Sequence, residues 1–198
     1  MSQMEPNTHS ITDFINGFNG GTRANRFKVM GNLPTRLTNR TNATTDFHIR
    51  SASIPGSIVG AIPINYRGRT VFYPGDRTYQ PWNITILDDI KKTSSNTQNA
   101  PDALFAAFHE WHQKINDHVS NTTTYLNTRQ SNPDMSDHFK SDWTVEQLDT
   151  NGTKTLKSFK LWHCWPVAIG PIELDMSQDN TLTTFSVTML YSHYEILT

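Results

Sequence analysis

Alternating apolar and polar positions along the chain predict several strands. In 26–29, Phe27 and Val29 alternate with polar residues, Trp82, Ile84 and Ile86 share one face of 82–87, and in 182–194 one face carries Phe185, Val187, Met189 and Tyr191. A period of two is typical of half-buried strands. Further strands are predicted at 46–52, 142–148, 153–165 and 172–176. The Asn151-Gly152 pair predicts a hairpin that joins 142–148 to 153–165.

One segment, 101–119, has its apolar residues at helical spacing. The apolar stripe consists of Leu104, Phe108, Trp111, Ile115 and Val119. Pro101 in the first turn and Asp102 near the positive end of the helix dipole favour a helix that begins there. A stripe along one face predicts a helix that packs on a sheet.

The segment 53–63 is apolar, yet its prolines and glycines predict an irregular loop. Its large aliphatic residues, and the proline that lies among them, are Ile54, Pro55, Ile58, Val59 and Ile62. The loop either folds back on its own core or packs on a neighbouring subunit, because exposed apolar patches usually mark interfaces. Next, 64–73 is predicted as a strand turned at Arg67-Gly68, and 74–77 as a turn.

The order of elements predicts the domain organisation and the fold class. Residues 1–24 are polar and glycine-rich, and are interpreted as an arm with one turn of helix near 11–18. Residues 25–198 form the folded domain, with polar insertions near 31–45 and 121–141. Strands, one helix and then more strands indicate an α+β fold, mainly antiparallel, built as a small β-barrel or sandwich with one flanking helix.

Composition and charge exclude several classes of protein. The net charge is −1 and the pI is about 6.7, so nothing favours a tight grip on nucleic-acid phosphates. No segment is typical of a signal peptide or a membrane span. The single cysteine, Cys164, fits a protein made in a reducing cytoplasm.

The chemistry-bearing residues do not form a recognisable active site. His109, Glu110 and His112 resemble a zinc-protease motif, but that motif needs histidines four positions apart, and residue 113 is Gln. Metal binding with His118 remains an alternative to a plain polar helix face. His163 precedes Cys164 on a strand, where neighbouring side chains point to opposite faces. We therefore expect no enzyme activity, no metal and no cofactor.

Four segments, in this order and spacing, resemble the tail tube proteins of contractile-tailed bacteriophages, a family similar in fold to the type VI secretion tube protein. The resemblance runs from about residue 25 to the end of the chain. The segments are ASIPGSIVGAIP at 52–63, GDRTYQPWNITI at 75–86, the helix with Phe108 and Trp111, and a C-terminal set formed by Trp165-Pro166, Gly170, Leu174-Asp175 and TFSVT at 184–188.

The resemblance implies a structural protein of the virion tail, whose six copies close into a ring and whose rings stack into a tube for DNA. Its implied partners are further copies of itself, the tail sheath, the tape measure protein, the baseplate and the tail terminator, with only transient passage of double-stranded DNA and no stable nucleic-acid or membrane binding. Subunit contacts are expected at Ile54, Pro55, Ile58, Val59, Ile62, Asp76 and Arg77. Candidate lumen-facing residues are Asp142, Glu146 and Lys157, with Lys154 and Lys160 nearby.

The chain departs from the family pattern in its N-terminal arm and in its two insertions. These departures leave open a subunit that initiates or terminates the tube of the same tail. A type VI-like secretion tube protein is the other alternative.

Overall fold

The computed structural model describes residues 11–17, 21–34, 37, 48–88, 103–123 and 139–197. Within these ranges the chain forms two helices and nine strands. The helices are α1 (Ile11–Gly17) and α2 (Ala103–Ile115). The strands are β1 (Phe27–Gly31), β2 (Ile49–Ala52), β3 (Ser57–Tyr66), β4 (Arg69–Tyr79), β5 (Trp82–Leu87), β6 (Ser141–Leu148), β7 (Thr155–Ile169), β8 (Thr184–Leu190) and β9 (His193–Leu197).

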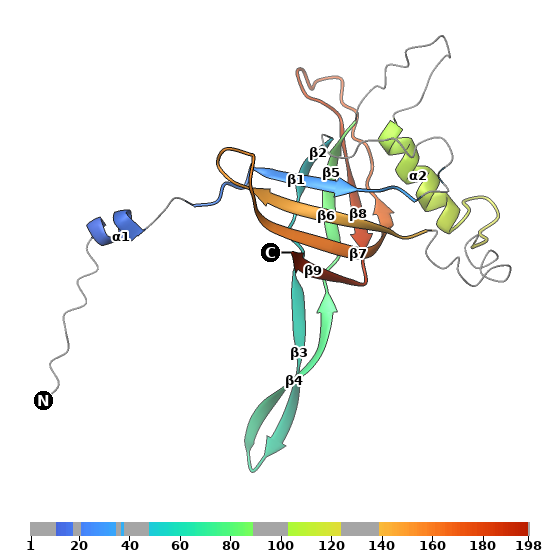
Figure 1. The fold of residues 1–198 in the computed structure, drawn as a ribbon. Coiled ribbons are helices and arrows are strands. Elements are labelled where there is room, and N and C mark those ends of the chain that lie inside the picture. The colour runs from blue at the N-terminus through green and yellow to red at the C-terminus, as the bar shows by residue number, and fades with distance from the viewer. Residues whose placement is uncertain are drawn as a thin grey trace, which may run out of the picture.

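The strands build a sandwich, and the long strand β7 takes part in both of its layers (Figure 1). The first half of β7 pairs with β6 on one edge and β9 on the other, and β1 extends this sheet beyond β6. The second half of β7 pairs with β8, which leads to β5 and β2. Every pairing is antiparallel, as the sequence predicted, and the helix-flanked α+β fold is confirmed.

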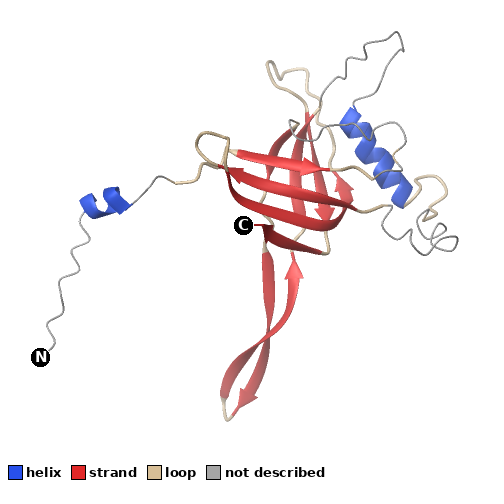
Figure 2. Cartoon of the chain, viewed as in Figure 1, coloured by secondary structure: helices blue, strands red, loops and turns tan. Residues whose placement is uncertain are grey.

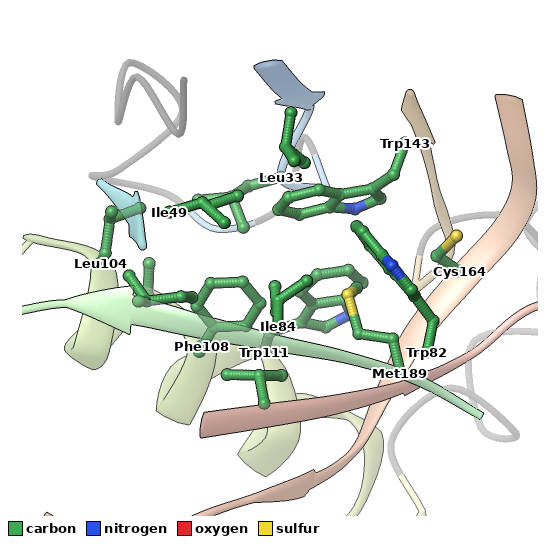
Figure 3. Packing of buried hydrophobic residues seen from close by; sticks show 14 of the residues in the cluster. Leu33, Ile49, Trp82, Ile84, Leu104, Phe108, Trp111, Trp143, Cys164 and Met189 are labelled. Atoms are coloured by element: carbon green, nitrogen blue, oxygen red, sulfur yellow. The ribbon is translucent and has the colours of Figure 1, made fainter. Parts of the chain in front are cut away.

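The core between the two sheets is aromatic, and α2 covers its side (Figures 1 and 3). Phe108 stacks on Trp111 with ring centroids 5.9 Å apart and lies 6.1 Å from Trp143. Trp82 meets Trp143 edge to face at 5.8 Å. The Trp111 indole also donates a 2.7 Å hydrogen bond to the Phe139 carbonyl. Each such buried side chain contributes roughly 1.5–3 kcal/mol, which is enough to dock a helix of this length.

The predicted helix stripe is confirmed at its centre and wrong at its C-terminal end. Leu104, Phe108 and Trp111 are buried and Ile115 is half-buried, but the helix ends at Ile115. Val119 is 93% exposed. Asp117, whose carboxylate accepts a 3.0 Å bond from the Ser120 amide, organises a turn in place of further helix.

The predicted loop at 53–63 and the predicted turn at 74–77 are wrong, because most of both segments forms the β3–β4 hairpin. An isolated two-stranded ribbon leaves one edge of each strand unpaired, so it tolerates proline, which has no N–H to donate. Ala61 faces Pro74 and Val59 faces Arg77, so two residues lie opposite Gly60 in a β-bulge. The predicted turn at Arg67-Gly68 is confirmed.

Two further expectations change in the C-terminal part. Residues 172–176 form no strand and belong to an irregular loop. The stretch 182–194 contains β8 and the start of β9, because the chain turns between these two strands at 191–192. Pro101, Asp102 and most of the two predicted insertions lie outside the described residues.

Candidate functional site

The β3–β4 hairpin projects away from one end of the sandwich (Figures 1 and 2). In the described part of the chain these two strands pair only with each other. They are joined by a tight turn in which Arg67 and Gly68 have φ values of 46° and 80°. Two consecutive positive φ values are typical of the type I′ turn, whose twist matches that of paired strands.

Apolar side chains occupy both faces of this hairpin. On one face Ile64 lies opposite Val71, and Ile62 lies opposite Tyr73; on the other, Pro63 lies opposite Phe72. Ile64 is 49% exposed and Phe72 is 68% exposed. A ribbon with two apolar faces and no core of its own presents the kind of surface that marks a protein interface.

A cluster of tyrosines fixes the base of the hairpin to the sandwich. The ring of Tyr79 lies 5.7 Å from that of Tyr191 and 5.6 Å from that of Tyr194. Tyr194 also shares a 3.4 Å hydrogen bond with Ser57 at the start of β3. Burial, with smaller contributions from Tyr194, Cys164 and Tyr79, raises the pKa of Tyr191 to about 12. The hairpin is therefore held at its base by packing between tyrosine rings, and the Tyr191 phenol stays neutral.

The structure brings most of the predicted contact residues together on or beside the hairpin. Asp76 and Arg77 are exposed on β4, and the Arg77 guanidinium donates a 3.1 Å bond to Ser57 Oγ. Pro55 is buried and does not belong to the exposed surface. The exposed aliphatic residues among the predicted set are Ile54, Ile58, Val59 and Ile62.

Sequence reasoning missed the second half of this surface. Tyr66, Val71, Phe72 and Tyr73 are also exposed on the hairpin. The signal was the strand pattern of 64–73 around Arg67-Gly68, which predicted a turned strand. It did not show that both faces of that strand lack a covering layer.

The candidate lumen residues divide between the two faces of the sheet that contains β6 and β7. Glu146 pairs with Ser158, and Lys157 pairs with Gln147, so Glu146 and Lys157 point to opposite faces. Asp142 accepts a 3.1 Å bond from the His163 amide and lies 3.7 Å from the Lys160 ammonium.

Lys160 has a second partner on the outward face of this sheet. Its ammonium lies 3.4 Å from the centroid of the Trp162 ring. An ammonium that already interacts with a carboxylate and an indole ring attracts a phosphate less strongly.

The enzyme-like residues do not assemble a reactive centre. Glu110 forms a 2.9 Å ion pair with Lys114, and no group of three potential metal ligands occurs among the described residues. Burial, followed by the nearby His112 and His118, lowers the pKa of His109. Burial raises the pKa of the Cys164 thiol to about 12, and the charge of Asp142 adds to this shift, so the reactive thiolate is disfavoured. None of the described helices has the length and apolarity needed to span a membrane.

Comparison with known proteins shows which sequences and folds this chain is similar to. The phage tail tube protein family model matches residues 22–197. Tail tube protein gp19 of Enterobacteria phage T4 is 26% identical over 149 residues, which cover 75% of this chain and 80% of the relative. The tail tube protein of Serratia phage KSP90 is 29% identical over 141 residues, covering 71% and 68% of the two chains.

Solved structures share the fold at low sequence identity. A chain of the sheath–tube complex of an extracellular contractile injection system superimposes with a TM-score of 0.55 at 15% identity, over 95% of this chain and 97% of that one. A chain from the tube-terminating cap of the anti-feeding prophage gives a TM-score of 0.54 at 19% identity, over 90% and 92%. With the family match over nearly the whole chain, these findings show that the chain belongs to the phage tail tube protein family, and is a structural tail component and not an enzyme.

Proposed function

We propose that this chain forms the tube of a contractile phage tail, as hexameric rings stacked around a channel for DNA. The observation that carries the proposal is the β3–β4 hairpin, which exposes apolar side chains on both faces. Full burial of one large apolar side chain contributes roughly 1.5–3 kcal/mol. Several half-exposed ones together are comparable with an association cost of roughly 4–15 kcal/mol. Contact residues in this proposal are Ile54, Ile58, Val59, Ile62, Asp76 and Arg77.

The open edges of the sheet support closure of a ring. In the described part of the chain, β1 and β9 lie at the two edges of the sheet that contains β6 and the first half of β7. An unpaired edge offers backbone donors and acceptors to another strand. Pairing of β1 in one subunit with β9 in the next is a heterologous contact, which generates a ring when the rotation between subunits closes. Closure would extend this sheet into one continuous barrel.

The outward face of that sheet would then line the channel. Asp142 and Glu146 lie on it, together with two lysines: Lys28 lies opposite Glu146 in the sheet, and Lys160 is engaged by Asp142 and Trp162. Free lysines would add salt-dependent affinity for each phosphate that passes, and that affinity would be repeated in every ring. Cations paired with carboxylates leave a channel through which DNA moves without being bound.

The remaining parts of the proposal concern partners and location. One similar structure is described as a sheath–tube complex, and others as a tube terminator and a terminating cap. By analogy this chain would contact a tail sheath, a tape measure protein, the baseplate and a terminator. It would be made in the host cytoplasm and incorporated into the virion tail.

Single substitutions on the hairpin test the proposal. We expect Ile64→Asp and Phe72→Asp, made separately, each to abolish assembly, because each places a charge in the buried contact. Far-ultraviolet circular dichroism of the monomer should stay unchanged, since neither side chain belongs to the core. Val119→Asp is the control, because Val119 is an exposed apolar residue, 93% exposed, that lies outside the hairpin. Normal assembly of both hairpin variants, measured by sedimentation with baseplates present, would contradict the proposal.

A further inference from the structure

We propose that the loop between β7 and β8 receives the tip of the hairpin from a subunit in the adjacent ring. The acidic loop is defined as residues 170–183, and the hairpin tip as residues 66–69. This inference rests on the proposed stacking of rings and names the surface that the hairpin meets. The partner is a second copy of this chain.

The acidic loop and the hairpin tip lie at opposite ends of the molecule (Figure 1). Strand β5 connects the two ends, because Trp82 follows the base of the hairpin, whereas Leu87 pairs with Thr184 beside the loop. Six residues of strand span about 20 Å. The hairpin extends away from this strand, so the tip of one chain cannot reach the loop of the same chain. A tip-to-loop contact therefore joins two chains head to tail, and repetition of such a contact builds a filament.

The two surfaces carry opposite charge. Arg67 lies in the turn at the hairpin tip and Arg69 directly follows the turn, and both are exposed. The acidic loop contains Glu173, Asp175 and Asp179, all exposed, and no lysine or arginine. Within the described residues, neither tip arginine forms an ion pair, and neither do the carboxylates of the loop. Complementary charge of this kind steers association and fixes register.

Apolar side chains accompany the charges on both surfaces. Leu174 is 84% exposed and Leu182 is 71% exposed, and Met176 beside them is fully exposed. On the tip, Tyr66 is exposed. The Arg67 guanidinium lies over the Tyr66 ring, with 5.3 Å between the guanidinium carbon and the ring centroid. Each surface thus combines an apolar part that gains from burial with charges that select the partner.

The acidic loop also has the shape of a receiving surface. It borders an open groove of about 500 Å³, whose lining includes Arg50, Glu173 and Asp175. This volume is within the roughly 300–1,000 Å³ of pockets that bury a ligand, so the groove has room for the side chains of the tip. Two carboxylates against the single Arg50 guanidinium leave the lining with an excess of negative charge. The Asp175 carboxylate accepts bonds of 2.9 Å and 2.8 Å from Ser177, which fix the conformation of the loop.

Charge reversal with rescue tests the inference. We expect Arg67→Glu/Arg69→Glu to reduce tube formation at least about tenfold, because the tip then repels the loop. Glu173→Arg/Asp179→Arg should do the same from the other side. The variant that combines all four substitutions restores opposite charges and should assemble within about twofold of the unaltered chain. Lys154→Glu/Lys157→Glu is the control that matches the charge change of the tip variant and leaves both surfaces intact.

The outcomes separate this inference from the proposed function. Assembly is measured on the full chain by sedimentation and negative-stain microscopy with baseplates as seeds. Rescue by the fourfold variant supports the inference. Normal assembly of the loop variant, or no rescue, overturns it, and the proposed function stands if Phe72→Asp still blocks assembly. Absence of tubes from the unaltered chain overturns both. A bis-maleimide cross-link between Arg67→Cys and Asp179→Cys, present in tubes and absent from monomers, supports the contact directly.

Discussion

Single residues in the aromatic core have little room for change, and Gly31 is the strongest case. A β-carbon added at Gly31 would overlap the Trp143 indole, which is fully buried between the two sheets. Trp143 is held on its other side by Trp82 and Phe108, so it has no space to move away. Glycine is required here by close approach and not by backbone conformation.

We therefore predict that Gly31→Ala lowers the free energy of unfolding by about 2 kcal/mol or more, the usual cost of overpacking a core. Urea denaturation followed by tryptophan fluorescence measures the change. Gly17→Ala is the control, because nothing lies within 4 Å of its added β-carbon. A Gly31→Ala variant as stable as the unaltered chain would show that Trp143 is less tightly held than its contacts indicate.

Among the elements, the hairpin shows where sequence reasoning fails and why. Proline and glycine at 55, 60, 63, 74 and 75 predicted irregular structure, since proline is excluded from central strands and glycine weakens a strand. In a lone two-stranded ribbon the free edges accept proline, and the β-bulge accommodates Gly60 and Gly75. The sequence pattern indicates which backbone conformations each residue favours. It does not indicate that the β3–β4 segment projects away from the sandwich. By contrast, α2 and β8 were predictable, because each buries one periodic face against the core.

The hairpin is also predicted to be dispensable for folding. Removing residues 61–74 joins Gly60 to Gly75 and leaves Gly60, Gly75 and Asp76 as a short connection, a length common in hairpins. We expect the shortened chain to keep its thermal unfolding midpoint within a few degrees, because the deleted residues are all exposed and none belongs to the core cluster. It should form no tubes. Thermal denaturation and sedimentation together measure both effects, and an unfolded product would show that the hairpin contributes to the fold.

At the scale of the whole molecule, the fold class and the family were accessible from the sequence, whereas the surfaces were not. Alternation, one helix stripe and the Asn151-Gly152 turn predicted an antiparallel sandwich with a flanking helix. Which faces remain uncovered depends on contacts between distant segments. The face that Asp142 shares with Lys160, for example, is set by the register that pairs Thr144 with Lys160, and no local pattern marks that register.

The charge arrangement of the assembled channel yields a prediction about DNA. Neither the monomer nor the assembled tube should retard double-stranded DNA in a gel at physiological salt. The reason is that the net charge is −1 and Lys160 on the proposed channel face is paired with Asp142. Lys160→Ala should leave this result unchanged. Submicromolar binding by the unaltered protein would contradict a channel through which DNA slides.

The central claim is that this chain closes into sixfold rings that stack into a tube. Electron microscopy of the purified full-length protein, alone and in the presence of baseplates, tests it most directly. The account predicts hollow rings of six subunits, stacked in register, with the β3–β4 hairpin of each subunit buried against a neighbour. Only monomers at high concentration and no polymer on the baseplates, or rings of a different order, would contradict it.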